Sequence, residues 1–304
     1  MEIGMVGLGR MGGSMAHRLL DNQHQVITYD VDSAAVNSLL QRGATGTVSL
    51  EDLAAKLDPP RVAWVMLPAG EQTEQTISHL SRLFAQGDTI IDGGNSHYVD
   101  TVRRASSLHK LGIKFLDVGT SGGVWGLDQG YSLMIGGDEE AFQTLQPLFQ
   151  ALAPTQDKGY GYVGGSGSGH FVKMVHNGIE YGMMQAYAEG FEIMRAKAEF
   201  ALNLSHVAEI WRYGSVIRSW LLDLTASALD AAPDLESVES YVDDSGEGRW
   251  IVQESVDLAI PIPVIALALQ SRFRSRQDSP FGGRLLAAMR NQFGGHSFKS
   301  RSDG

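Results

Sequence analysis

Three glycines near the start of the chain, Gly7, Gly9 and Gly12, restrict how this segment can fold. They follow a hydrophobic run that is typical of a β-strand and precede a helical pattern, so they form a G-x-G-x-x-G loop between strand and helix. The first glycine permits a tight turn, the second lets the backbone approach a pyrophosphate, and the third lets the helix pack closely on the strand. We therefore expect a dinucleotide-binding loop made of Gly7, Leu8, Gly9, Arg10, Met11 and Gly12.

An acidic residue, Asp30, ends the second predicted strand and lies 18 residues beyond Gly12. Dinucleotide-binding domains place an acid about 20 residues after the glycines, where it binds the ribose hydroxyls. A carboxylate there repels a 2′-phosphate, and the next residues, Val31 and Asp32, provide no arginine to bind one. The sequence therefore predicts NAD as the cofactor in preference to NADP. Asp30 also has a simpler interpretation, as the N-cap of the next helix.

Short β-branched runs alternate with helical patterns up to about residue 165, and only helical patterns follow the glycine-rich segment 164–169. The alternation is typical of βαβ units and a parallel sheet. We expect an α/β plus all-α protein, in which a Rossmann-type doubly wound sheet at 1–168 precedes a helical domain at 169–304. The predicted strands are 3–7, 25–29, 61–67, 89–92, 114–118, 131–135 and 159–163. The predicted later helices are 170–197, 205–213, 216–231, 247–259, 263–276 and 280–292, with 294–304 as a tail.

Charge and residue usage exclude several classes of function. The 24 Lys and Arg against 35 Asp and Glu give a net charge of −11, which argues against nucleic acid and anionic membrane as partners. The chain has no cysteine, so thiolate metal sites and cysteine nucleophiles are excluded, and its nine histidines show no H-E-x-x-H spacing. We expect no metal. With no signal sequence and no apolar stretch long enough to span a bilayer, we expect a soluble, cytoplasmic protein.

Polar side chains gather in three later segments. Two of them, 92–96 and 120–123, follow predicted strands, so both are expected at the carboxyl edge of the sheet, where ligands bind. In the third, polar residues recur at spacings of three and four, which places them on one face of a helix. A solvated helix face would show similar spacing, but with repeats of Glu and Lys rather than this mixture. The residues are Lys173, His176, Asn177, Glu180 and Tyr181.

With these motifs the chain resembles the short, bacterial-type 6-phosphogluconate dehydrogenases of the β-hydroxyacid dehydrogenase superfamily. The resemblance covers nearly the whole length, from the glycine loop through D-G-G-N-S at 92–96, S-G-G at 121–123 and the polar helix face to G-E-G-R-W at 246–250. The superfamily shares the first four in some form, whereas Glu180-Tyr181 and the last segment indicate the phosphogluconate branch. The resemblance implies oxidative decarboxylation of 6-phosphogluconate to ribulose 5-phosphate, a pentose phosphate pathway reaction, without a metal, and Asp30 adds the preference for NAD.

The same resemblance implies two catalytic residues. Lys173 matches the general base that takes the proton of the carbon 3 hydroxyl and then returns it to the carbonyl oxygen. Glu180 matches the acid that protonates carbon 1 of the enediol after carbon dioxide has left. The chemistry needs both groups, because hydride loss is easier once the hydroxyl proton has left and the enediol must receive a proton at carbon. Since lysine is ordinarily protonated at pH 7, Lys173 must be desolvated or crowded by other cations.

The resemblance also implies the substrate contacts. The groups that hold the carboxylate and hydroxyls are Asn95, Ser121, Gly122, Gly123, His176 and Asn177, with Asn95 also near the nicotinamide. Tyr181 and Arg272 match phosphate contacts, and Arg290 and His296 match a tail pair that reaches the site of a neighbouring subunit. The helical domain is present once here and duplicated in the long forms, so its open face needs a partner. We expect a homodimer or homotetramer.

One departure from the family concerns the phosphate. The long forms carry Lys and Thr where this chain has Ser245 and Glu247. A carboxylate beside a phosphate is unfavourable, so we expect Glu247 to point elsewhere.

Two alternative functions remain open. The first is a non-decarboxylating dehydrogenase of the 3-hydroxyisobutyrate type, which would need neither Glu180 nor phosphate-binding residues. The second is an NAD-binding regulatory or scaffold protein without catalysis, against which the presence of both Lys173 and Glu180 argues.

Overall fold

The computed structural model describes residues 1–297 and 299. The chain divides into two compact units, residues 1–177 and the residues from Gly178 onward, and each is considered by itself. The division falls inside a long helix, α8 (Ser168–Ala196), and not at its beginning. The domain boundary between residues 168 and 169 stays a prediction.

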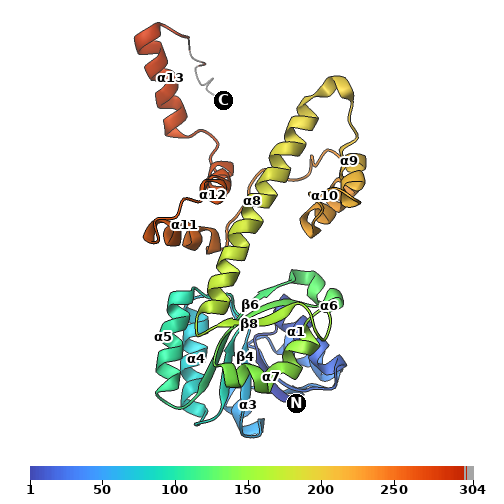
Figure 1. The fold of residues 1–304 in the computed structure, drawn as a ribbon, viewed down its shortest axis with the longest axis vertical. Coiled ribbons are helices and arrows are strands. Elements are labelled where there is room, and N and C mark those ends of the chain that lie inside the picture. The colour runs from blue at the N-terminus through green and yellow to red at the C-terminus, as the bar shows by residue number, and fades with distance from the viewer. Residues whose placement is uncertain (298, 300–304) are drawn as a thin grey trace. The chain divides into compact units, whose positions relative to one another are not determined.

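The first unit is built on one eight-stranded sheet with helices on both faces (Figure 1). The strand order is β3-β2-β1-β4-β5-β6-β7-β8, and neighbours run parallel except β6 and β7, which are antiparallel. The expected doubly wound sheet is therefore confirmed, with one antiparallel pair that the sequence analysis did not predict. Parallel neighbours need a crossover of about a dozen residues or more, and the link between β6 and β7, residues 122–131, is shorter. The strands are β1 Glu2–Val6, β2 Gln25–Tyr29, β3 Thr45–Gly46, β4 Val62–Val65, β5 Thr89–Asp92, β6 Lys114–Ser121, β7 Ser132–Gly137 and β8 Tyr160–Gly164.

The sheet has a hydrophobic core on each face, because both faces of a doubly wound sheet are covered by helices. Side chains alternate along β4, where Trp64 belongs to one core and Val65 to the other. Helices α1 and α7 pack into the first core, and α3, α4 and α5 into the second. The helices are α1 Arg10–Asp21, α2 Ser33–Leu40, α3 Leu50–Lys56, α4 Glu71–Leu83, α5 Tyr98–His109, α6 Gly126–Gln129 and α7 Glu139–Leu152, with a short 3₁₀ helix at Gly123–Trp125.

Every predicted strand is present, with its ends shifted by at most three residues. Strand β3 was not predicted, because a strand of two residues, Thr45–Gly46, is too short to show alternation.

The second unit is helical from Gly178 onward. Its apolar side chains form two clusters, one around Phe191 and Leu222 and one around Tyr181 and Leu269. The predicted helices are present, but α10 begins at Trp220 instead of residue 216, because Ser219 caps it by accepting a hydrogen bond from the Leu222 N–H. The elements after α8 are a 3₁₀ helix at Ala198–Phe200 and the helices α9 Leu204–Arg212, α10 Trp220–Ala231, α11 Glu247–Asp257, α12 Pro263–Ser275 and α13 Phe281–Gly294.

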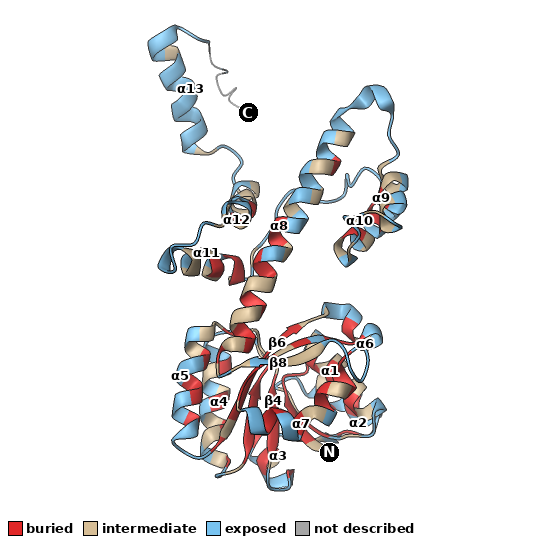
Figure 2. Ribbon diagram, in the orientation of Figure 1, coloured by how far each residue is buried: buried red, intermediate tan, exposed pale blue. Residues whose placement is uncertain are grey.

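Helix α13 is exposed along almost its whole length (Figure 2). Large apolar side chains recur on it every four residues, so they share one face. They are Phe281, Leu285, Met289 and Phe293, and Phe293 is 79% exposed. A helix face of this kind ordinarily packs against another surface. None of the helices within the described residues is both long and apolar enough to cross a membrane.

Candidate functional site

The glycine loop has the geometry that the motif predicts. Gly7 has φ +91°, and a Cβ there would lie 2.6 Å from the Met66 carbonyl oxygen. A Cβ on Gly12 would lie 2.0 Å from the Gly7 carbonyl oxygen, so helix α1 approaches the loop too closely for any side chain. A Cβ on Gly9 would meet no atom within 4 Å, so the loop is open on this side. Since Gly9 precedes the N-terminus of α1, backbone N–H groups face an open space that suits a pyrophosphate.

Asp30 joins the glycine loop to the end of β2. Its Oδ2 accepts a hydrogen bond from the Leu8 N–H at 2.6 Å and its Oδ1 accepts one from the Asp32 N–H at 2.8 Å. Asp30 also lines a pocket of about 510 Å³ formed with residues of α2 and the β3 segment. The N-cap interpretation of Asp30 is wrong, because Asp32 caps α2 by accepting from the Ala34 N–H. Asp30 is thus fixed beside the loop, where a ribose would follow the pyrophosphate.

The segment after β5 is held by a buried ionic network. Asp92 is fully buried and accepts hydrogen bonds from the Gly94 N–H at 3.1 Å and the Ser96 hydroxyl at 2.9 Å. Arg104 of α5 donates to Asp92 at 3.0 Å and to Glu74 of α4 at 2.7 Å. Arg103 also donates to Glu74, and these hydrogen bonds, led by the one from Arg103, lower the pKa of Glu74 to about 2. The network fixes the turn that carries Asn95.

Asn95 connects this turn to β6. Its backbone is left-handed, with φ +51°, a conformation that asparagine tolerates better than most residues. Its side-chain amide accepts from the Thr120 N–H at 2.9 Å and donates to the Thr120 carbonyl at 3.2 Å. The two predicted substrate segments at the ends of β5 and β6 are therefore joined, and Ser121, Gly122 and Gly123 continue directly from Thr120.

Lys173 lies on α8 in direct contact with β6. A Cβ added at Gly119 would lie 2.5 Å from the Lys173 Cβ, so the helix rests on the strand at this point. Lys173 is 6% exposed, which meets the requirement for desolvation. Its Nζ lies 3.4 Å from His176 Nδ1, which in turn lies 3.0 Å from the Asn177 Oδ1. The first unit thus places Lys173, His176 and Asn177 next to one another, on a helix that packs against the strand leading to Ser121.

The predicted phosphate residues of the second unit also lie together. The Arg272 guanidinium stacks on the Tyr181 ring at 3.5 Å from its centroid and donates to the Asp243 carbonyl at 2.9 Å. The Ser245 N–H lies 3.4 Å from the Tyr181 hydroxyl oxygen. Glu247 is buried and accepts a hydrogen bond from the Ser245 hydroxyl, so its carboxylate points back to its own turn. Glu180 precedes Tyr181 on α8.

Beside them, Asp244 pairs with two further arginines. It accepts hydrogen bonds from Arg249 and Arg276 at 2.6 Å each, and these hydrogen bonds, led by the one from Arg249, lower the pKa of Asp244 to about 2. The sequence analysis did not single out Asp244 or Arg276.

The predicted tail pair lies elsewhere in the second unit. Arg290 is exposed on α13, and the exposed His296 follows that helix with its ring 6.4 Å from the Phe293 ring. Over residues 1–297 and 299, no hydrogen bond or ion pair joins either of them to Arg272 or Tyr181.

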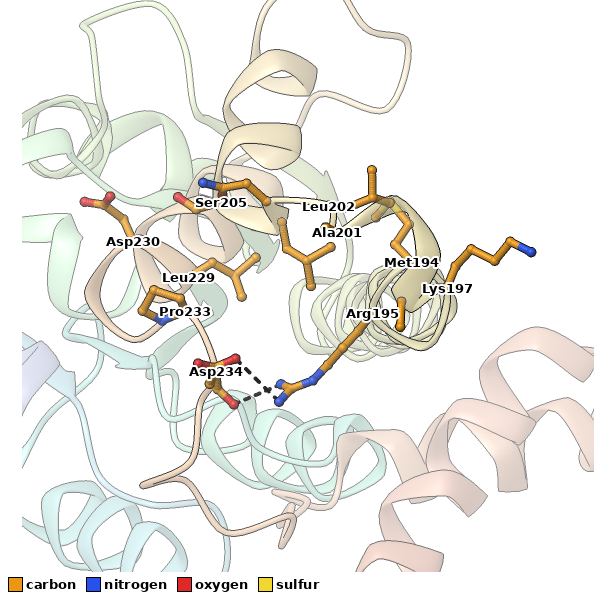
Figure 3. Close-up of a pocket in the computed structure, with 13 residues that line it drawn as sticks. Met194, Arg195, Lys197, Ala201, Leu202, Ser205, Leu229, Asp230, Pro233 and Asp234 are labelled. Carbon is orange, nitrogen blue, oxygen red and sulfur yellow. Dashed lines mark hydrogen bonds and ion pairs between the residues drawn. The ribbon is translucent and has the colours of Figure 1, made fainter.

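A pocket of about 460 Å³ at the end of α8 contains none of these residues (Figure 3). Arg195 points across it and donates to the Asp234 carbonyl at 2.9 Å. Lys197, another lining residue, forms an ion pair with Glu199 at 2.7 Å. The predicted site residues thus lie outside this pocket, in one set in each unit. In the described part of the chain no group of three or more His, Asp or Glu side chains is arranged to hold a metal ion.

Comparison with known families identifies both halves of the chain. A family model described as the NAD binding domain of 6-phosphogluconate dehydrogenase matches residues 2–164, and one described as the 6-phosphogluconate dehydrogenase C-terminal domain matches residues 169–280. A Haloferax volcanii protein named 6-phosphogluconate dehydrogenase, NAD(+)-dependent, decarboxylating, is 42% identical over 100% of both chains.

Solved structures show the same architecture. The Plasmodium falciparum 6-phosphogluconate dehydrogenase, described in complex with NADP+ and with 6-phosphogluconate, is 27% identical with a TM-score of 0.83, and the match covers 100% of this chain and 67% of that one. A Mycobacterium tuberculosis 3-hydroxyisobutyrate dehydrogenase is 20% identical with a TM-score of 0.71, over 88% of this chain and 90% of that one. The second likeness is one of fold alone.

Proposed function

Because the chain belongs to the 6-phosphogluconate dehydrogenase family, we propose that it catalyses the NAD-dependent oxidative decarboxylation of 6-phosphogluconate to ribulose 5-phosphate and carbon dioxide. The observation that carries the proposal is Lys173, an almost fully buried lysine that lies against β6 with His176 beside it. A desolvated lysine amine suits the base that this oxidation needs.

The first unit fits a dinucleotide. The N–H groups at the start of α1 bind the pyrophosphate, and Gly9 leaves the space for it. Each Asp30 oxygen already accepts one backbone N–H and has capacity to accept a ribose hydroxyl. The carboxylate repels a 2′-phosphate, which favours NAD over NADP. When bound there, NAD would supply the acceptor for the hydride that leaves carbon 3 of the substrate.

Lys173 and Glu180 perform the proton transfers of the reaction. Lys173 takes the proton of the carbon 3 hydroxyl as the hydride leaves, and as an ammonium it then polarises the new carbonyl. The carbon–carbon bond to the carboxylate breaks, carbon dioxide leaves, and Lys173 returns its proton to the oxygen on carbon 3. Glu180 then protonates carbon 1 of the enediol while Lys173 takes back the proton of the hydroxyl on carbon 3, which leaves the ketone of ribulose 5-phosphate. The groups that hold the carboxylate and hydroxyls are Asn95, Ser121, Gly122, Gly123, His176 and Asn177.

Tyr181 and Arg272 bind the phosphate. A guanidinium has five N–H donors, and stacking on Tyr181 orients the donors that the Asp243 carbonyl leaves available. The carboxylate of Glu247 does not oppose this arrangement, because it is held by Ser245.

The test is an assay of the purified chain with NAD and 6-phosphogluconate. We expect NADH, carbon dioxide and ribulose 5-phosphate in equal amounts, because one oxidation is followed by one decarboxylation. A similar kcat/KM with NADP would overturn the assigned role of Asp30. Formation of NADH only with small unphosphorylated hydroxyacids would instead assign the chain to the 3-hydroxyisobutyrate type.

The site is completed by a neighbouring subunit in the homodimer or homotetramer that we propose. Helix α13 supports this, because its apolar face is exposed in the single chain. A pocket of about 520 Å³ between α8, α9 and α10, lined mainly by apolar side chains such as Phe191 and Leu221, adds a second surface that a partner can cover. Arg290 on α13 and His296 after it then reach the phosphate of the neighbouring site.

We expect the double variant Leu285→Glu/Met289→Glu to lose the oligomer. Two carboxylates on the apolar face of α13 are costly to bury against a partner. Sedimentation velocity should show monomers that still bind NAD but turn over poorly, since Arg290 and His296 no longer reach a neighbour. Ala287 lies on the opposite face of α13, so Ala287→Glu is the matched control and should stay oligomeric. An oligomer that survives the double variant excludes α13 as the interface.

A further inference from the structure

A buried carboxylate on β6, Asp117, is used by no step described so far. It is fully buried, and it is the register partner of Asp92 on the neighbouring strand. Its Oδ1 accepts a hydrogen bond from the Gly167 N–H at 2.7 Å and its Oδ2 accepts one from the His170 N–H at 2.9 Å. Gly167 directly precedes α8, the helix that carries Lys173, and His170 lies in its first turn.

These contacts suit a carboxylate better than any other side chain. Two N–H groups converge on one residue, and only an ionised carboxylate offers an acceptor oxygen to each without bringing a donor of its own. The N-terminus of a long helix also stabilises negative charge, which offsets part of the cost of burying it. Asp117 therefore caps α8 from a strand that lies 50 residues or more away in sequence.

Asp117 and Gly119 lie on the same face of β6, because side chains alternate along a strand. Asp117 holds the first turn of α8 on this face, and Gly119 lets the next turn rest on the backbone. A Cβ at Gly119 would lie 2.5 Å from the Lys173 Cβ and 2.7 Å from the Gly169 carbonyl oxygen. The position of Lys173 along and above β6 is thus set by one cap and one close contact.

A second attachment holds the same turn from the side of α5. His170 is buried, and its Nδ1 lies 2.8 Å from the Thr101 hydroxyl. The Phe171 ring packs edge-on against Tyr98 at 5.3 Å between centroids. Helix α5 follows the turn that carries Asn95, so the first turn of α8 is fixed to both elements that present substrate residues.

We propose that Asp117 is a positioning residue for the reaction, which sets the first turn of α8 so that the Lys173 amine meets the substrate hydroxyl. The proposal rests on the proposed function of Lys173. This role is distinct from that of the dinucleotide loop, which is held by the hydrogen bond from Leu8 to Asp30.

The test is Asp117→Asn, which keeps the shape but turns an NH₂ group toward one of the two N–H donors. We expect kcat to fall about a hundredfold, the size of loss that follows from a displacement of about 1 Å in a catalytic group. The affinity for NAD should stay unchanged. The primary isotope effect on kcat with 6-phosphogluconate deuterated at carbon 3 should increase, because oxidation becomes rate-limiting. Amide hydrogen exchange should accelerate at residues 167–173.

The matched control is Asp138→Asn. Asp138 caps α7 by accepting from the Ala141 N–H at 3.1 Å, so the same chemical change is made at a helix away from Lys173. We expect Asp138→Asn to lower the melting temperature without changing kcat or the isotope effect. If Asp117→Asn behaves like this control, the cap is structural only and the proposal is overturned.

Thr101→Val provides a second, uncharged test of the same turn. It removes the hydrogen bond to His170 and should lower kcat by a smaller factor, with the same rise in the isotope effect. If neither variant can be obtained folded, the attachments serve folding and the positioning role is rejected. If the unmodified chain does not oxidise 6-phosphogluconate, the proposed function fails, and hydrogen exchange at 167–173 in Asp117→Asn still tests the cap.

Discussion

Replacing Lys173 with methionine is expected to abolish measurable turnover of 6-phosphogluconate while NAD binding is retained. Methionine has a similar length and stays compatible with a buried position, but it cannot accept the hydroxyl proton or polarise the carbonyl. Loss of a general base lowers rates by about 10²–10⁴-fold, and Lys173 serves two steps. NAD affinity can be followed by fluorescence titration and turnover by NADH absorbance. The largest effect should fall on kcat.

Lys197→Met is the matched control, because Lys197 follows the same helix but pairs with Glu199 outside the candidate site. This variant should keep the kcat of the unmodified chain. If Lys173→Met retained a tenth or more of the activity, another residue would have to be the base. An unmodified chain that binds NAD and turns over no hydroxyacid would favour the regulatory alternative.

The second large effect is expected at Arg104. Its side chain is 3% exposed and forms ion pairs with Asp92, which is fully buried, and with Glu74. Arg104→Met leaves the Asp92 carboxylate buried without its guanidinium. Breaking a buried ion pair on one side costs about 3–5 kcal/mol. We expect the free energy of unfolding of the first unit, measured with urea at pH 7, to fall by about this amount.

Arg103 offers a control at the next position. It also donates to Glu74, but its side chain is 55% exposed, and exposed ion pairs contribute about 0–1 kcal/mol. Arg103→Met should therefore have a small effect, and equal losses for the two variants would contradict the argument.

The pH of the measurement matters, because the pKa of Glu74 is lowered to about 2. Its contribution is present above the ordinary pKa of about 4.5 and is lost as the pH falls toward about 2.

The parts of the fold and site that depend on local pattern were predictable from the sequence. The glycine loop, Asp30 and the helical face of Lys173 each lie within a short stretch whose spacing has a physical reason. Strand β6 continues beyond its predicted end because its last residues pair with β7, a contact that the β6 segment alone does not show.

The parts that depend on distant pairing were not predictable. Asp117 lies in the hydrophobic run Phe115–Val118. An acid inside such a run indicates a buried carboxylate, which needs hydrogen-bond donors or a counter-charge. The sequence does not say that the partner is the backbone of α8. The Asn95 contact with Thr120 and the turn of Glu247 toward Ser245 likewise require the folded chain. That Tyr181 and Arg272 both belong to the phosphate site was expected only from the family resemblance, and their stacking was not predicted.

The neighbouring carboxylates of β5 and β6, Asp92 and Asp117, receive their hydrogen bonds from two different kinds of donor. Mutations should therefore affect the two carboxylates differently. Asp92 depends on the side chain of Arg104, so one codon change at position 104 can remove its counter-charge. Asp117 depends on the main chain of residues 167 and 170, which every replacement except proline retains. Under random mutagenesis, replacement of either Asp92 or Arg104 should therefore remove their ion pair directly. At Asp117 only the acceptor is lost with its side chain, and its donor positions are restricted for other reasons: a Cβ at Gly167, which has φ +94°, would lie 2.7 Å from Val102 Cγ2, and the His170 side chain contacts Thr101.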